Sequence, residues 1–342
     1  MATFHVTEYL GDGIGPELSE AVHRVADALP INIVFHPIDL SVESREKDGK
    51  ALYDAALESI QRTQVALKYP TATVKESPNA VLRRLCDFTV IHRPVATIPG
   101  LPTNFTEQFD LDIIRVATGG TYEDPGRNIG KAGAVSVRIV EAETVEQAAV
   151  YAFELARRTG RTVTSASKYT IQRITDGLFE RVIDQVAESY QGVQRRKELF
   201  DALLAKIIIS PRDYEIILVL NEYGDFLSDM ACGLAGSIGI GASGSFSFDD
   251  RFKVKLAMFD PSGGTAPDIA GQDKANPTAV FLAFSMLLHE IGANACAEAL
   301  KTANMNLLHE GETTADLGGS LSLSAFTGRI IERARESLAG KR

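Results

Sequence analysis

The chain has 342 residues, of which 45% are hydrophobic and 23% charged, and its formal net charge is -10 at pH 7. A single hydrophobic core stops growing well before this length, so we expect two domains. The negative charge argues against a nucleic-acid binder, which needs a basic face. The longest apolar run near the C-terminus, 279 to 288, is about half a membrane span, so we expect a soluble protein that does not enter membranes.

The cysteines and the N-terminus bear on the compartment. Cys86, Cys232 and Cys296 are far apart, lie in apolar contexts and do not have metal-ligand spacing. This predicts buried, reduced thiols, and the N-terminus lacks a basic region followed by an apolar one. We therefore expect a cytoplasmic location.

The first segments alternate between strand-like and helix-like patterns. Residues 3–10 alternate as a strand, a glycine-rich turn follows at 11–17, and 18–29 has helical spacing. Glycines allow close approach of the backbone to a ligand, and a helix N-terminus favours anions. The spacing is not the GxGxxG dinucleotide fingerprint, so the turn either binds a ligand or only connects two elements.

The same alternation continues with a strand at 31–40, a helix at 54–64 and a strand at 65–69. This order is typical of a mostly parallel sheet. Ser77 can cap a helix that places Asn79 and Arg83 on one face, and Arg93 and Arg115 each end an apolar strand-like segment. If the three arginines converge they bind two or three carboxylates, since guanidinium groups pair with carboxylates through two bonds; otherwise they are solvated.

The middle of the chain has its own set of elements. The proline-rich segment 94–102 is a plausible crossing into a second domain, and the strand-like segment 134–140 suggests a hairpin arm that pairs with a partner subunit. A helix at 144–159, a strand at 161–165 before Lys168, and helices at 181–189 and 198–207 follow, and the Gly- and Ser-rich segment 241–249 is a candidate return crossing.

Two aspartates are one helical turn apart behind an apolar strand. Asp225 and Asp229 repel each other, and the residues that follow, 231–246, contain no cation. A divalent ion such as Mg²⁺ or Mn²⁺ would compensate both charges, although a solvated helix start is the alternative. Later, the loop 259–271 and the helix that Asn276 and Pro277 open have small residues that suit a nucleotide, or a flexible connection.

Taken together, these segments resemble the β-decarboxylating dehydrogenase family, which comprises isocitrate, 3-isopropylmalate and homoisocitrate dehydrogenases with their tartrate and malate relatives. The resemblance covers nearly the whole chain in order. It rests on GDGIGPE at 11–17, SxNxxLRR at 77–84, TDGLFERV at 175–182, NEYGDFLSD at 221–229, GTAPDIAG at 264–271, ANP at 275–277 and DLGG at 316–319.

The resemblance implies roles for residues around the substrate. Arg83, Arg93 and Arg115 match carboxylate-binding arginines, and Ser77 and Asn79 match positions that contact the distal part of the substrate. Tyr122 matches the tyrosine that protonates the enolate, and Lys168 the lysine that helps to remove the hydroxyl proton. Asp225 and Asp229 match ligands of Mg²⁺ or Mn²⁺, and Asp201 a third ligand given, like Lys168, across a homodimer.

The resemblance also implies NAD as cofactor. Asp268 matches the acidic residue that accepts the adenosine ribose hydroxyls and selects NAD over NADP, and Asn276 would contact the adenine. The remaining expected cofactor contacts are Ile14, Gly264, Thr265, Ala266, Pro267 and Ile269.

The expected reaction is oxidative decarboxylation of a small polycarboxylic acid. Ser77 and Asn79 present hydrogen-bonding groups, which an apolar branch would leave unpaired, so isocitrate is favoured over 3-isopropylmalate. Some residues depart from the family pattern: Val116, Ala117, Gly119 and Thr121 replace polar ones, Thr170 replaces Asn, Gly263 replaces His and Asp260 replaces Glu. These departures leave open an isocitrate-like acid of specialised metabolism, or a non-catalytic regulatory subunit of a hetero-oligomeric isocitrate dehydrogenase.

The expected fold is the two-domain α/β fold of this family. Residues 1–98 and 252–342 would form a large, cofactor-binding domain with a mostly parallel sheet. Residues 99–251 would form a smaller α/β domain with the dimer arm and the metal ligands, and the substrate would lie between the two.

Overall fold

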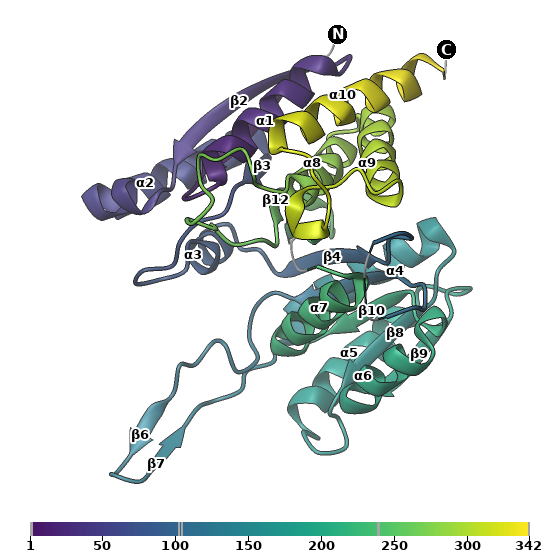
Figure 1. Cartoon of the computed structure of the whole chain (residues 1–342). Helices are drawn as coiled ribbons and strands as arrows, with labels where there is room; N and C mark the ends of the chain where they lie inside the picture. Colours follow the sequence, from purple (N-terminus) through teal and green to yellow (C-terminus); the bar gives the residue numbers. More distant parts are fainter. Residues whose placement is uncertain (1–2, 102, 104, 238–239, 341–342) are drawn as a thin grey trace.

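The computed structural model describes residues 3–101, 103, 105–237 and 240–340. One ten-stranded sheet runs through both parts of the molecule, in the order β2-β1-β3-β12-β11-β4-β5-β10-β8-β9 (Figure 1). The strands of this sheet are β1 (Thr3–Leu10), β2 (Asn32–Asp39), β3 (Val65–Lys68), β4 (Val90–Ala96), β5 (Asp110–Val116), β8 (Val163–Ser167), β9 (Arg195–Leu199), β10 (Ile216–Val219), β11 (Ala242–Phe248) and β12 (Val254–Pro261).

The sheet consists of two parallel blocks. In one, β1 pairs in parallel with β2 and β3, and β3 with β12; in the other, β10 pairs in parallel with β5 and β8, and β8 with β9. Between them β11 is antiparallel to both β12 and β4, and β4 is antiparallel to β5. The prediction of an α/β fold with a mostly parallel sheet is therefore confirmed.

Helices connect the strands and cover the sheet, as parallel strands require. In the first of them, buried Leu18, Val22 and Val25 form one apolar stripe. The helices are α1 (Gly15–Ala28), α2 (Val42–Thr63), α3 (Pro78–Leu85), α4 (Ala142–Thr159), α5 (Thr175–Ala187), α6 (Phe200–Ile209), α7 (Asn221–Ala235), α8 (Thr278–Glu290), α9 (Asn294–His309) and α10 (Leu323–Ala339). Within the described residues, none of them is long and apolar enough to cross a membrane.

The two blocks draw on different parts of the chain. The strands β1, β2, β3 and β12 come from the two ends of the chain, whereas β5, β8, β9 and β10 come from its middle. Strand β4, which the predicted division places in the large domain, pairs on both sides with strands of the predicted small domain. The division at residues 98 and 252 stays a prediction.

Several predicted elements differ from the structure. The segment 241–249 is not a loop but contains the buried strand β11. Its small residues let it lie close to the neighbouring strand: a Cβ on Gly244 would lie 3.0 Å from the ring of Phe259 on β12. Pro94 is part of β4 rather than of a linker. The polar strand β9 was not predicted, the predicted loop from 259 begins inside β12, and α2 begins twelve residues before its predicted start, with Ser41 as its cap.

A two-stranded hairpin projects from the middle of the chain as an arm. It is formed by β6 (Arg127–Ile129) and β7 (Gly133–Val135), which pair with each other and extend away from the sheet (Figure 1). The predicted strand at 134–140 is thus shorter than expected, although Ile139 also pairs with Gly120 at the base of the arm. Ile129 is 60% exposed, which is unusual for an isoleucine and leaves apolar surface on the arm.

Candidate active site

The first turns of α7 bring the two predicted metal ligands to the end of the parallel block. Strand β10 ends at Val219, and the helix that follows carries Asp225 and Asp229 on one face. Arg93 Nη1 lies 3.4 Å from an Asp229 oxygen and 3.9 Å from an Asp225 oxygen, and Arg115 Nη1 donates to Asp225. The arginines therefore compensate the repulsion between the two carboxylates.

The three predicted carboxylate-binding arginines come from three elements and lie in one cluster. Arg83 is on α3, Arg93 on β4 and Arg115 near the end of β5. Burial, and then the neighbouring Arg83, lowers the pKa of Arg115 to about 10; burial, and then Arg93, lowers the pKa of Arg83. Such mutual repulsion of buried cations is relieved by anions, so the cluster is suited to a ligand with several carboxylates.

Tyr122 lies at the edge of this cluster. Its hydroxyl donates to Asp225 Oδ2 at 3.2 Å, and the Arg115 guanidinium carbon lies 5.9 Å from the centre of its ring. Burial and the Asp225 charge raise the pKa of Tyr122, although the side chain is half exposed. The hydroxyl thus keeps its proton at neutral pH.

The two predicted distal contacts lie at the start of α3. Ser77 is the N-cap residue of α3, as predicted, although its side chain makes no capping hydrogen bond. Asn79 Oδ1 is buried and has no hydrogen-bond partner among the described residues. A buried amide oxygen without a donor is costly, and a substrate that donates to it would remove that cost.

Lys168 and Asp201 form a pair of their own. Lys168 follows β8, Asp201 is in the first turn of α6, and Lys168 Nζ lies 2.6 Å from Asp201 Oδ1. This contact lowers the pKa of Asp201. In the described part of the chain no group of three His, Cys, Asp or Glu side chains could hold a metal ion, so one chain brings together Asp225 and Asp229 but not Asp201.

The predicted cofactor loop closes over the glycine-rich turn. Ile14 N donates to Thr265 O at 2.9 Å, and a Cβ on Gly13, which has a positive φ of 59°, would collide with the same carbonyl. Asn276 Nδ2 donates to Asp316 at 2.9 Å, while Asp268 is exposed. The turn and the loop, far apart in sequence, therefore form one surface.

Sequence reasoning missed two residues that hold Arg115. Asn221 Oδ1 accepts from Arg115 Nε at 2.9 Å, and Asn221 Nδ2 donates to Gly119 O at 3.0 Å. Gly224 packs against the same side chain, where an added Cβ would lie 2.6 Å from Arg115 Cβ. The sequence signal available for Asn221 was its position as a polar residue directly after an apolar strand-like segment. No feature of the sequence indicated the contact of Gly224 with Arg115.

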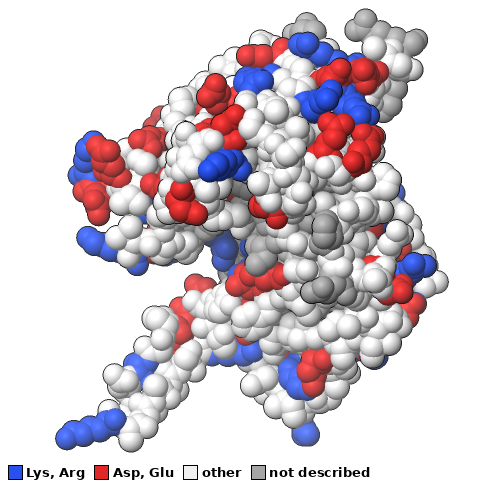
Figure 2. Space-filling view, in the orientation of Figure 1, with Lys and Arg blue, Asp and Glu red and all other residues white. Residues whose placement is uncertain are grey.

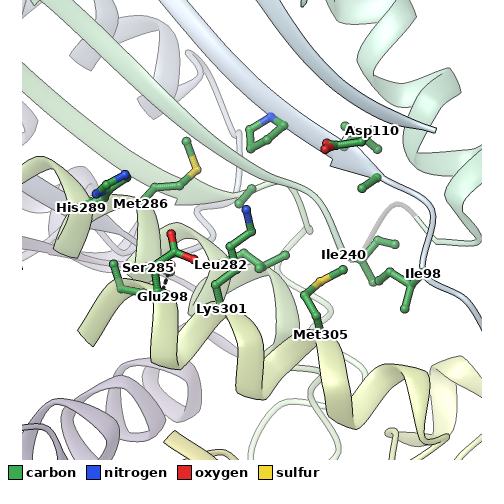
Figure 3. A pocket seen from close by; sticks show the side chains of 15 residues that line it. Ile98, Asp110, Ile240, Leu282, Ser285, Met286, His289, Glu298, Lys301 and Met305 are labelled. Atoms are coloured by element: carbon green, nitrogen blue, oxygen red, sulfur yellow. Dashed lines mark hydrogen bonds between the residues drawn. The ribbon is translucent and has the colours of Figure 1, made fainter. Parts of the chain in front are cut away.

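The charged site residues lie apart from a mainly apolar cavity elsewhere in the molecule. Acidic and basic side chains face each other across a recess beside the arm (Figure 2). A separate cavity of about 150 Å³ lies between β4 and the helices α8 and α9, with Lys301 and Met305 extending toward it from α9 (Figure 3). It is lined by none of the predicted site residues, and its surface is mainly apolar, so it does not suit a polycarboxylate.

Comparison with known proteins identifies the family. The family model for isocitrate/isopropylmalate dehydrogenase matches residues 5–333. The alpha subunit of the probable mitochondrial isocitrate dehydrogenase [NAD] of Drosophila melanogaster is 33% identical, over 97% of this chain and 88% of the relative. A mitochondrial regulatory subunit of the isocitrate dehydrogenase [NAD] of Dictyostelium discoideum is 32% identical, over 97% of this chain and 92% of the relative.

A solved structure agrees with these relatives. The isocitrate dehydrogenase from Methylococcus capsulatus superposes with a TM-score of 0.87 at 29% identity, over 97% of this chain and 99% of that one. The expected cytoplasmic location is wrong, because the relatives from fly and slime mould are both named as mitochondrial proteins. Sequence motifs, sheet order and these relatives agree that the chain belongs to the isocitrate/isopropylmalate dehydrogenase family.

Proposed function

We propose that this protein is an enzyme that oxidises and decarboxylates isocitrate to 2-oxoglutarate, with NAD and with Mg²⁺ or Mn²⁺. The observation that carries the proposal is the meeting of the Arg93 and Arg115 guanidinium groups, two aspartates and Tyr122 in one cluster, with the Arg83 guanidinium close enough to be acted on by Arg93 and Asp225. Cations and hard oxygen ligands in one place suit an acid with several carboxylates that is bound together with a divalent ion.

The residues present fit the ion and the cofactor that the family implies. Asp225 and Asp229 would hold the ion, and the surface formed by Gly13 and Thr265 would hold NAD, with Asp268 at the ribose. When bound, the ion supplies electrostatic stabilisation of the oxygen that loses its proton, and NAD supplies the hydride acceptor.

The chain's own residues then bind the acid and move protons. Arg83, Arg93 and Arg115 bind its carboxylates, and Asn79 accepts a hydrogen bond at its distal end. Lys168 takes the hydroxyl proton, and Tyr122 returns a proton to the carbon that loses CO₂. The raised pKa of Tyr122 agrees with that role, since the phenol must carry its proton until the step occurs.

A homodimer with shared sites completes this arrangement. We infer that Lys168 and Asp201 serve the neighbouring subunit's cleft, because in one chain they pair with each other and not with Asp225 and Asp229. Exposed apolar side chains occur on α6, on α7 and in the segment between Lys168 and α5, as expected of an interface between subunits; they are Ile171, Ile174, Ile208, Ile209 and Phe226, all at least half exposed.

A regulatory subunit of a hetero-oligomeric enzyme is the second candidate. It is favoured by the slime-mould relative, which is named as regulatory, and by the loss of polar residues at 116–121. In that role the chain would bind a polycarboxylic acid without turning it over. The presence of Asp201, Asp225, Asp229, Lys168 and Tyr122 favours the enzyme.

A substrate panel tests the proposal. We expect NADH formation with isocitrate, Mn²⁺ and NAD, and much less with homoisocitrate, 3-isopropylmalate, malate or tartrate. Turnover of another acid on the panel would replace isocitrate as substrate. Binding of isocitrate without turnover of any of the five acids would favour the regulatory role.

A further inference from the structure

A buried carboxylate fixes the backbone of Lys168. Asp176, at the start of α5, is fully buried, and its Oδ2 accepts from the Lys168 backbone N–H at 2.7 Å and from the Tyr223 hydroxyl at 3.2 Å. On the other side of the residue, the Lys168 carbonyl accepts from the N–H groups of Ile171 and Gln172, each at 2.9 Å. The main chain at Lys168 is therefore fixed from both sides.

The guanidinium of Arg138 balances the negative charges of two buried carboxylates, those of Asp176 and Glu222. Arg138 Nη2 lies 3.1 Å from Asp176 Oδ1, and Arg138 Nη1 lies 2.7 Å from the nearly buried Glu222 Oε1. These are ion pairs by distance, with angles that depart from hydrogen-bond geometry. The same guanidinium covers the Tyr223 ring at 4.9 Å. Buried carboxylates need such a cation, because an unpaired buried charge is strongly unfavourable.

Arg138 also connects this group to the arm. It lies in the segment that returns from β7, and the next residue, Ile139, pairs with Gly120: Gly120 N donates to Ile139 O at 2.6 Å and Ile139 N to Gly120 O at 3.1 Å. Gly120 precedes Tyr122 by two residues. The contacts of Asp176 and Arg138 thus connect three parts of the chain: Lys168, the first turn of α7 and the loop that carries Tyr122.

We propose that Asp176 is a positioning residue for the reaction, which holds Lys168 where it serves the neighbouring cleft, while Arg138 holds Asp176. The proposal rests on the proposed function, since Lys168 acts there as the base. Asp176 acts through Lys168 and does not touch the substrate. Proton transfer depends steeply on the placement of the base, and a displacement of about 1 Å costs roughly 100-fold in rate.

Kinetics of the full-length protein give the first test. We expect Asp176→Ala to lower kcat about 10- to 100-fold while the KM for isocitrate stays within about threefold. The variant is expected to fold, because Arg138 still pairs with Glu222. Asp176→Asn keeps an acceptor for the Lys168 N–H and should recover most of the loss. The matched control is Asp112→Asn, a buried carboxylate that pairs with His92 and Arg161, which should leave kcat within about twofold.

Mixed dimers separate a role at Lys168 from a role at α7. In a dimer of one Asp176→Ala chain and one Asp229→Ala chain, both defects fall on the same site if Asp176 serves Lys168, and the other site is intact. We expect about half of the wild-type activity per dimer. If Asp176 instead served α7 of its own chain, each site would carry one defect, and activity would stay at or below that of the Asp176→Ala homodimer, which overturns the proposal.

Two controls distinguish a failure of the positioning role from a failure of the proposed function. A mixed dimer of Lys168→Ala and Asp229→Ala chains must recover activity if sites are shared at all. Failure of this control, or an inactive wild type, contradicts the proposed function. Hydrogen exchange on the unliganded protein then decides: faster exchange at the Lys168 amide in Asp176→Ala than in Asp112→Asn supports the positioning role, and equal exchange overturns it.

Discussion

At the scale of single residues, the placement of Arg115 depends on Gly224, which lies in the segment NEYGDFLSD but whose contact with Arg115 the sequence does not indicate. A Cβ at Gly224 would lie 2.6 Å from the Cβ and Cγ of Arg115, and both backbones are fixed, one in α7 and the other in β5. The arginine side chain must therefore move if any other residue occupies this position.

We predict that Gly224→Ala raises the KM for isocitrate about tenfold or more and destabilises the fold by about 1 to 3 kcal/mol, because overpacking displaces Arg115. The measurements are steady-state kinetics and denaturant unfolding. Gly233→Ala is the matched control on the same helix, since a Cβ there meets no atom within 4 Å. It should leave the KM unchanged and stabilise the helix slightly. Equal KM values for the two variants would refute the contact.

Asp268 gives a second prediction at this scale. An acidic residue at the ribose accepts the hydroxyls of NAD and repels the 2′-phosphate of NADP. We expect the double variant Asp268→Lys, Ile269→Tyr to shift the ratio of kcat/KM values toward NADP by about tenfold or more. A ratio that does not change would remove the ribose role from Asp268.

The residues that sequence patterns could and could not predict differ in a physical way. Arg115 lies near the end of β5, which is parallel to β10, and α7 follows β10, so the approach of Arg115 to Asp225 could be inferred. Arg93 was also predicted to end a strand, but it lies in the middle of β4, which is antiparallel to β5, so its approach did not follow from a strand end. Asp176 lies in the segment TDGLFERV, but no role for it followed from the sequence, and Arg138 carried no sign because its two carboxylate partners lie on elements far apart in the sequence. A pairing of buried charges that are far apart in the chain produces no periodic pattern in the sequence.

At the scale of elements, two strands of the sheet were not predicted, because few of their residues are the large apolar ones by which a buried strand is recognised in a sequence. Strand β11 is rich in small residues and reads as a loop, yet it is buried between β12 and β4. Strand β9, with sequence RRKEL, lies at the edge of the sheet and needs no apolar face. The helices α1 and α4 each have one apolar face, and their predicted limits lie within three residues of the observed ones.

The arm is the element on which a partner subunit should depend. We predict that replacing residues 127–135 by a short Gly-Ser turn weakens or abolishes the dimer, because the arm exposes Ile129 and extends away from its own sheet. Sedimentation velocity measures the change, and circular dichroism checks that the remaining fold is intact. A folded variant that stays dimeric at micromolar concentration would show that the arm is not needed for pairing.

At the scale of the whole molecule, the proposed function requires the charged groups of the cleft to change partners. In one chain, Arg93 and Arg115 pair with Asp225 and Asp229, and Lys168 pairs with Asp201. If the site acts as proposed, binding exchanges these pairs: the arginines turn to the acid and the aspartates to the ion. The substrate and the ion should therefore bind cooperatively.

This exchange predicts how metal removal acts. We expect EDTA to abolish turnover and to weaken isocitrate binding about tenfold or more, because Asp225 and Asp229 then keep the arginines occupied. Calorimetric titration of isocitrate with and without Mn²⁺ measures the coupling, and re-addition of Mn²⁺ should restore both properties. Equal affinities in the two titrations would contradict the exchange.

The central claim is that two chains build one metal site, and anomalous diffraction from crystals grown with Mn²⁺ and isocitrate tests it most directly. The claim predicts one Mn²⁺ in each cleft, bound by Asp225 and Asp229 of one protomer and by Asp201 of the other. An ion bound by residues of a single chain, or no ion between these aspartates, would contradict it.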